Sequence, residues 1–252
     1  MGMDIYAGTF IRYYAQNWKT KTQQFCEENG IAYNVIRANH DEHEKQDLLE
    51  EIIEGVHNWQ NKMIEILESH DINGFELWEE NNEKEYYTDK PDWDALGALL
   101  LMVSAKVLGK DCPAEYEKNM DFHPYIEEAT AEKLDDWSLL AGVCHFIPQN
   151  KYLMFDWFLA NGKKASFATT ANLKAELDAI NDILWNVDEN TILEWTETEG
   201  YPVDAVFQNG KYRRLQESTV YNTESLAKFC FSILYRAVRF SFENNVPVIF
   251  DF

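Results

Sequence analysis

Two Asn-Gly pairs constrain the fold of this chain more than any other feature of the sequence. Asn161-Gly162 and Asn209-Gly210 lie 48 residues apart, and each sits between short stretches rich in β-forming residues. Asn-Gly suits the left-handed backbone of a two-residue hairpin turn, so each pair predicts an antiparallel β-hairpin. The predicted strands are Tyr152–Leu159 with Lys164–Ala168, and Ala205–Gln208 with Tyr212–Leu215.

A helical pattern follows each hairpin, and other helices and strands are expected before them. The clearest helix spans residues 49–67, where apolar residues recur every three or four positions and form one face. Further helices are expected over Lys19–Asn29, Asp92–Leu108, 170–185 and 223–242, with short helical pieces at Ala114–Asn119 and Ala131–Leu140. Strands are expected over Ile5–Tyr14, Ile31–Arg37, Val143–Ile147 and Val246–Phe250, with a hairpin joining Phe75–Glu79 to Glu85–Thr88.

These elements together predict an α+β fold. It consists mostly of antiparallel strands and hairpins, with about four to six helices packed on them. The chain of 252 residues has no linker rich in Pro, Gly or Ser, so a single domain over 1–252 is expected. A shift in charge near residue 130 offers one subdivision, into an acidic half (1–130) and a half of hairpins and helices (131–252).

The charge of the chain is strongly negative and unevenly placed. The formal net charge is -22, and residues 41–94 hold 18 acidic and 4 basic side chains, which is 4 - 18 = -14. Residues 205–240 hold 6 basic and 2 acidic side chains, a local +4. Such a field repels nucleic acid and anionic membranes and attracts cationic partners.

The compartment expected from the sequence is the cytoplasm. The four cysteines are widely spaced, without the paired spacing of a metal or redox motif or the density of a disulfide scaffold. The first residues lack the basic and apolar regions of a secretory signal. The longest apolar stretch, Ala95 to Val103, is far shorter than the roughly 20 residues that span a bilayer.

Metal binding is the first catalytic hypothesis. His40, His43, Glu54 and His57 are residue types that bind zinc and other transition metals. Only one Glu-x-x-His pair occurs, whereas a di-iron bundle needs two, and His-Glu-x-x-His is absent. We interpret these residues as a solvated helix start and assign no metal and no cofactor.

Two other groups could support acid–base or nucleophilic chemistry. Asp121 and His123 could form a carboxylate-oriented general base, but no nucleophile motif lies near them, and a turn before Pro124 is the simpler interpretation. Cys144 next to His145 is expected to be a buried structural thiol beside a core histidine.

Arg12 stands among aromatic residues in the first expected strand. An arginine in this setting pairs with a carboxylate or binds an anionic ligand. Because the chain holds 44 acidic residues, an internal ion pair is expected.

The acidic stretch gives the leading functional hypothesis, in which carboxylates surround aromatic residues on one face. Charge accelerates the encounter with a basic protein, and aromatic contacts hold the complex. The predicted partner-binding residues are Glu50, Glu54, Trp78, Glu79, Glu80, Glu83, Glu85, Tyr86, Tyr87, Asp92 and Trp93.

We therefore expect a cytoplasmic, non-catalytic binding protein whose acidic face, within 41–94, docks a cationic protein. The immunity proteins that neutralise bacterial toxins fit this physical description by analogy of charge and class. Two alternatives stay open. One is a hydrolase or metalloenzyme that uses the His40, His43, Glu54 and His57 group, or Asp121 with His123. The other is a structural homo-oligomer that pairs the acidic half with the basic 205–240 segment.

Overall fold

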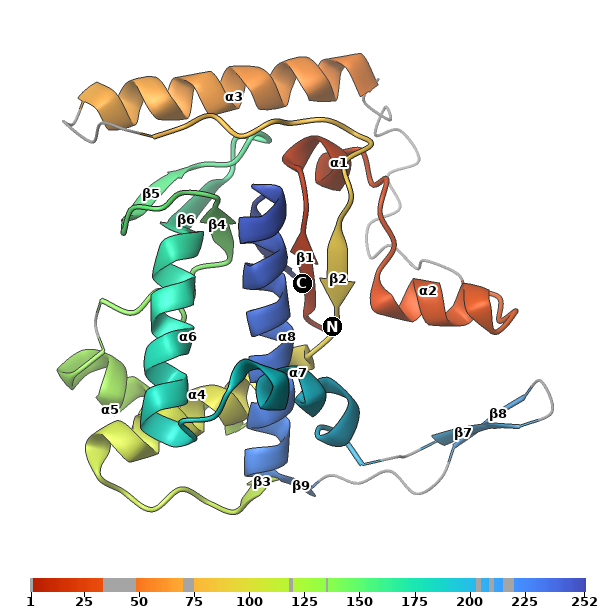
Figure 1. Ribbon diagram of the computed structural model, residues 1–252, viewed down its shortest axis with the longest axis vertical. Coiled ribbons are helices and arrows are strands. Elements are labelled where there is room, and N and C mark those ends of the chain that lie inside the picture. Colours follow the sequence, from red (N-terminus) through yellow and green to blue (C-terminus); the bar gives the residue numbers. More distant parts are fainter. Residues whose placement is uncertain are drawn as a thin grey trace.

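The structure is a computed structural model of the full chain (Figure 1). It describes residues 2–33, 49–69, 75–117, 120–134, 136–202, 205–208, 211–214 and 220–252. For residues 121, 205–208 and 211–214 the description covers the backbone alone.

Six strands form the main sheet, in the order β2-β1-β10-β4-β6-β5. Their bounds are β1 Asp4–Ala7, β2 Tyr87–Asp89, β4 His145–Ile147, β5 Met154–Phe158, β6 Lys164–Thr169 and β10 Val248–Asp251. All neighbours are antiparallel except β4 and β6, which are parallel. Two small sheets pair β3 Glu115–Glu117 with β9 Val220–Asn222, and β7 Ala205–Gln208 with β8 Lys211–Arg214.

The described ranges contain eight α-helices and one short 3-10 helix, Met120–Phe122. The α-helices are α1 Phe10–Tyr14, α2 Lys21–Glu28, α3 Leu49–Ser69, α4 Asp92–Leu108, α5 Pro124–Glu132, α6 Thr170–Leu184, α7 Glu189–Thr198 and α8 Thr223–Asn244. The α+β class is thus confirmed, although the helices outnumber the four to six expected. No helix in the described ranges is long and apolar enough to cross a membrane.

Strands β1, β4, β6 and β10 send alternate side chains into two separate apolar cores. Ile5, Phe146 and Val248 enter the larger core, which is closed by α4, α6, α7 and α8. Their neighbours Tyr6 and Ile249 enter the smaller core, together with residues of α1 and α3. The period-2 alternation of a strand produces this division, so each face of the sheet needs its own cover.

Both sides of residue 130 contribute to the main sheet. Strands β1 and β2 come from the first half, and the other four come from the second. Helix α4 of the first half packs against α8 of the second within the larger core. Residue 130 therefore does not separate two sheets or two cores.

The strand expected over Ile5–Tyr14 is wrong beyond Ala7. The chain turns after β1, and Thr9 caps α1 by accepting a hydrogen bond from the Arg12 amide at 3.3 Å. Side-chain capping by threonine overrides the β propensity of the aromatic residues that follow. Arg12 therefore lies on a helix.

Other expected elements are also corrected by long-range contacts. The hairpin joining Phe75–Glu79 to Glu85–Thr88 does not form, because residues 75–80 have no regular structure and β2 pairs with β1. Ala114–Asn119 holds strand β3, paired with β9, in place of a helix. In place of the helix expected over Ala131–Leu140, helix α5 spans Pro124–Glu132 and so ends at the second residue of the expected range. Residues 31–33 are not a strand, and the rest of Ile31–Arg37 lies outside the described residues.

The local turn and helix signals are confirmed. Strands β5 and β6 form a hairpin through Asn161-Gly162, where Gly162 has φ 80°. Strands β7 and β8 pair on either side of residues 209–210. Helices α3, α4, α6 and α8 and strand β10 also form close to the expected ranges.

We predict that Leu99→Ala, within α4, lowers the free energy of unfolding by about 2–5 kcal/mol, because Leu99 is fully buried in the larger core. Urea denaturation measures the change. Leu77→Ala is the control, since Leu77 is 55% exposed and its truncation should change stability by about 0.5 kcal/mol or less. Equal losses for both variants would contradict the core described here.

Candidate functional site

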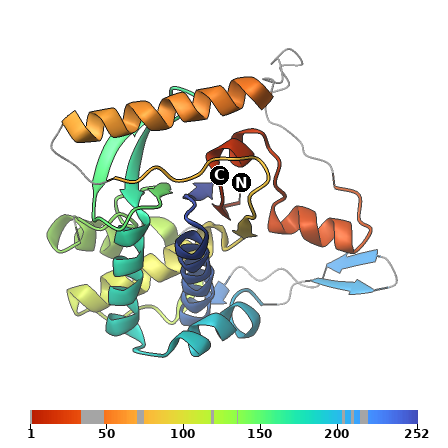
Figure 2. The same cartoon turned by 45° about the horizontal axis from the view of Figure 1, so that its top comes forward.

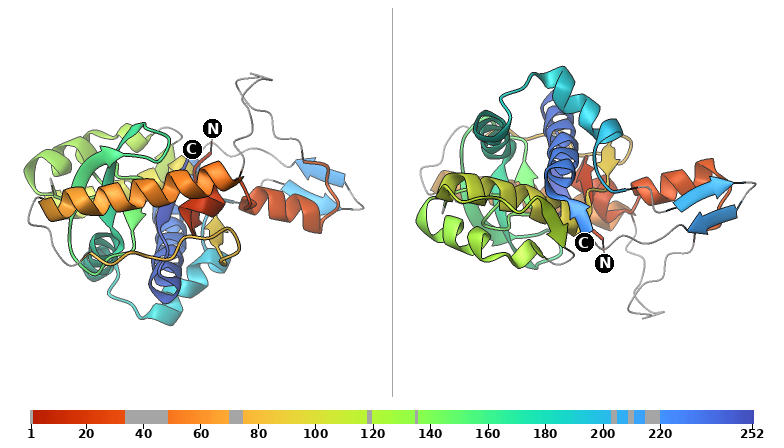
Figure 3. Two further views of the ribbon diagram at one scale, coloured as in Figure 1. Left: turned by 90° about the horizontal axis from the view of Figure 1, so that it is seen from above. Right: turned by 90° about the horizontal axis from the view of Figure 1, so that it is seen from below.

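Helix α3 covers the smaller core with one face and presents acidic residues on the other. Its buried face includes Val56, Trp59, Met63 and Leu67. Seen from above, α3 lies across the sheet, apart from the helices of the larger core (Figure 3). Its exposed acidic residues are Glu50, Glu51, Glu54, Glu65 and Glu68. Amphipathic spacing thus produces both the cover of the core and the charged surface.

The segment 75–86 follows α3 and runs back beside it without regular structure (Figure 2). Side chains hold its backbone in place of strand pairing. The Asn81 carbonyl accepts from the Thr9 hydroxyl at 2.5 Å, and the Trp78 carbonyl accepts from Gln60 Nε2 of α3 at 2.9 Å. At the start of the segment, Gln149 bonds both the amide and the carbonyl of Glu76, at 3.1 and 2.6 Å.

Glu80 fixes the centre of this segment from inside the protein. Its side chain is 7% exposed, and its two oxygens accept from the Ile11 amide at 2.9 Å and from Trp78 Nε1 at 2.5 Å. Burial raises the pKa of Glu80 to about 7, and the N–H groups of Ile11, Trp78 and Phe10 limit the rise. Glu80 therefore joins the segment to the start of α1.

We define the acidic face as the exposed acidic residues of α3 and of the segment 75–86. It comprises Glu50, Glu51, Glu54, Glu65, Glu68, Glu76, Glu79, Glu83 and Glu85. Within the described part of the chain, no ion pair involves any residue of 49–85, although Lys62 and Lys84 lie there. Acidic residues elsewhere, such as Glu128 and Glu189, have basic partners. In the described ranges, the carboxylates of the acidic face thus have no basic partner in an ion pair.

Five of the predicted partner-binding residues are exposed and belong to this set: Glu50, Glu54, Glu79, Glu83 and Glu85. Trp78 and Glu80 are buried and so cannot touch a partner in this arrangement. Trp59, another aromatic of the acidic stretch, is also buried. Two apolar side chains among these acids are exposed, Leu77 by 55% and Leu49 by 42%.

Tyr86 is half-buried and belongs to the support of the face. The guanidinium of Arg12 lies 4.4 Å from the centre of its ring, and the Tyr86 hydroxyl accepts from the Lys19 amide at 3.0 Å. Arg12 also donates to the carbonyls of Asn17 and Lys84, at 2.6 and 2.7 Å. Arg12 therefore binds backbone carbonyls and an aromatic ring where an ion pair with a carboxylate was expected.

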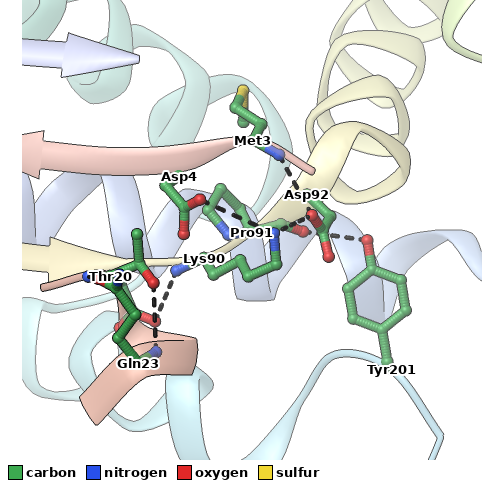
Figure 4. A network of polar contacts seen from close by, with 9 residues as sticks. Met3, Asp4, Thr20, Gln23, Lys90, Pro91, Asp92 and Tyr201 are labelled. Atoms are coloured by element: carbon green, nitrogen blue, oxygen red, sulfur yellow. Dashed lines mark hydrogen bonds and ion pairs between the residues drawn. The ribbon is translucent and has the colours of Figure 1, made fainter. Parts of the chain in front are cut away.

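Tyr87 and Trp93 pack against the larger core, and Asp92 is the first residue of α4. The ammonium of Lys90 sits between Asp92, at 2.8 Å, and Asp4, at 3.9 Å (Figure 4). Asp92 also accepts from the Met3 amide at 3.2 Å, and Trp93 packs edge-on against Phe252. These contacts join β1 and the chain end to the start of α4, which is a structural role.

The metal candidates do not converge in the residues described. Glu54 and His57 are exposed on α3, and His40 and His43 lie outside the described residues. Across the described ranges, no group of three His, Cys, Asp or Glu side chains is arranged to hold a metal ion.

The surroundings of the catalytic candidates favour structural roles for these residues. His123 caps α5, with its Nδ1 accepting from the Tyr125 amide at 3.2 Å, while the Asp121 side chain is not among those described. Burial lowers the pKa of His145 to about 4 and raises the pKa of the Cys144 thiol to about 11. Neutral imidazole beside protonated thiol at neutral pH gives no activated nucleophile. All four cysteines are free thiols.

Sequence reasoning missed the supporting role of Glu80. Glu79, Glu80 and Glu83 look alike in the sequence, but only Glu80 meets the α1 amides, through a contact that spans 69 residues. Glu176 is a second such case, since it is buried and accepts from the amides of Ser138 and Leu139. The local signal that distinguishes Glu80 is its place two residues after Trp78, from whose indole N–H it accepts a hydrogen bond.

Comparisons of the chain with models of protein families, with curated proteins and with solved structures found no match.

We predict that Glu80→Gln removes one component of the pH dependence of stability. The folded pKa of Glu80 exceeds its ordinary value of 4.5, so this group stabilises the fold fully below pH 4.5 and progressively less as the pH rises through 7. The stability difference between wild type and Glu80→Gln should therefore fall by on the order of 3 kcal/mol from pH 4.5 to 7.5.

Urea denaturation across this pH range measures the difference, and other titrating groups such as His145 cancel in it. Glu79→Gln is the matched control, because Glu79 is exposed, and its curve should run parallel to that of the wild type. A Glu80→Gln curve that also runs parallel would refute the burial of this carboxyl group.

Proposed function

We propose that this protein is a non-catalytic binding protein whose acidic face docks a cationic protein partner. The observation that carries the proposal is a set of nine exposed carboxylates between residues 50 and 85. None of them forms an ion pair with any residue that the structure describes. A surface whose charges are all of one sign raises the rate of encounter with oppositely charged proteins.

The spacing of these carboxylates favours a partner over simple solvation. Glu50 and Glu54 are four residues apart on α3, where like charges repel by about 0.2–0.5 kcal/mol per pair. A cationic partner relieves this repulsion when it binds. Leu77 supplies exposed apolar area among the acids, and apolar contact at the centre of a charged rim slows dissociation.

The rigid support beneath the face also suits binding. Trp59 of α3 donates to the Phe158 carbonyl at 2.5 Å, and Glu80 and Gln60 hold the segment 75–86 from below. A surface that is ordered before binding loses less conformational entropy when the complex forms. An inhibitor or immunity protein acting in the cytoplasm fits this description, and four free thiols are compatible with a reducing compartment.

We predict that Glu54→Lys, Glu79→Lys and Glu83→Lys, combined in one variant, weaken capture of a basic protein from native lysate by about tenfold or more. The three residues are exposed, so the melting temperature should change little. Capture by the wild type should also fall steeply as the salt concentration rises. Quantitative mass spectrometry of the captured proteins gives the readout.

The matched control is a variant with Glu132→Lys, Glu194→Lys and Glu197→Lys. These residues are equally exposed, but they lie on α5 and α7, and the change in net charge is the same. The control should capture the same protein as the wild type. Equal losses in the two triple variants would mean that total charge, and not the acidic face, attracts the partner.

A further inference from the structure

The two edges of the six-stranded sheet differ in how they are protected. Strand β2, at one edge, has three residues and is followed by Lys90 and Pro91, which disfavour pairing with another strand. Strand β5, at the other edge, has five residues and contains neither lysine nor proline. It exposes Met154 by 39% and Phe158 by 41%, and the preceding Tyr152 is 71% exposed. An unprotected apolar edge of this kind is a template for strand pairing.

The register of the hairpin shows which amide groups of β5 are free. The Thr169 amide donates to the Leu153 carbonyl at 3.1 Å, and the Leu159 amide donates to the Lys163 carbonyl at 2.7 Å. Bonded positions alternate along an antiparallel pair, so the odd-numbered residues of β5 bond to β6. The backbone N–H and C=O groups of Met154 and Asp156 therefore point away from the sheet.

Helix α3 marks one end of this open edge. The carbonyl of Phe158 also points outward, and it accepts the indole N–H of Trp59. The open part is thus residues 154–157, next to the helix that carries much of the acidic face (Figure 2). In the part of the chain that the structure describes, no strand pairs with it.

We propose that the free edge of β5 is a strand-addition site for an extended segment of the cationic partner. This inference rests on the proposed function, because the acidic face would bring the partner to the adjacent edge. Main-chain hydrogen bonds to Met154 and Asp156 supply affinity, and alternate side chains supply specificity. Met154, Asp156 and Phe158 share one face, so the recognised segment alternates apolar, basic and apolar residues on that face.

Charge favours a basic segment over a second copy of this chain. In the centred antiparallel pairing of two β5 strands, Asp156 would lie opposite its own copy, and like charges directly opposite are destabilising. Two molecules of net charge -22 also repel each other. Lys163 and Lys164 lie at the hairpin end, beyond the open part of β5. Asp156 is the charged residue of the open part, so we expect the basic residue of the bound segment to lie opposite it.

The test uses a short capped peptide in which valine, lysine and valine occupy every second position and threonines fill the positions between them. Calorimetry measures the affinity of the protein for this peptide. N-methylation of the amides that would bond to β5 keeps the charge but removes the hydrogen bonds. Met154→Pro removes an outward N–H group without breaking the β5–β6 ladder, since proline is tolerated on edge strands. Each change should weaken binding by about tenfold or more, whereas Met154→Ala should change it by about twofold or less.

A charge swap tests the register. Asp156→Lys should weaken binding of the lysine peptide and favour the same peptide with glutamate in place of lysine. Unchanged affinity after both Met154→Pro and N-methylation would overturn the proposal. A dimer that light scattering detects and that Met154→Pro dissociates would also overturn it, in favour of a second copy.

The outcomes separate this inference from the proposed function. If Met154→Pro leaves lysate capture intact while the reversal of Glu54, Glu79 and Glu83 abolishes it, docking on the acidic face stands and strand addition fails. If the peptide results hold but that reversal leaves capture unchanged, the edge binds strands and the proposed function fails.

Discussion

The requirement to cover both faces of one sheet governs the structure. Strand alternation directs Ile5 and Val248 to one side and Tyr6 and Ile249 to the other, so two apolar cores form. Several helices close the larger core, but α3 provides the main helical cover of the smaller one. Because α3 must bury its apolar stripe there, its acidic stripe faces outward. The charged surface is thus a consequence of how the sheet is closed.

The local parts of this fold could be predicted from sequence and the long-range parts could not. The Asn161-Gly162 hairpin and helix α3 follow from turn chemistry and from periodicity, which act within a few residues. Thr9 caps α1 locally, but Glu80 also bonds the Ile11 amide of α1 from 69 residues away, and the path of residues 75–86 depends on the long-range contacts of Thr9 and Glu80. Propensity favoured strands at both places, and tertiary hydrogen bonds decided otherwise.

The candidate site shows the same division. The sequence located the acidic stretch, and the exposed residues Glu50, Glu54, Glu79, Glu83 and Glu85 come from it. It could not separate them from Glu80, or separate surface aromatics from core aromatics such as Trp78, because burial is a property of the whole fold. The structure therefore places the exposed acids of this stretch on α3 and on the segment 75–86, over a core rich in aromatic residues and next to strand β5.

Carboxyl labelling with a carbodiimide and an amine, read by mass spectrometry with and without the captured partner, tests the central claim most directly. In the free protein Glu79 and Glu83 should label readily and Glu80 should resist. With the partner bound, labelling at Glu54, Glu79 and Glu83 should fall while Glu132, Glu194 and Glu197 remain unchanged. Equal labelling of Glu79 and Glu80 in the free protein, or a bound partner that leaves Glu54, Glu79 and Glu83 as reactive as before, would contradict it.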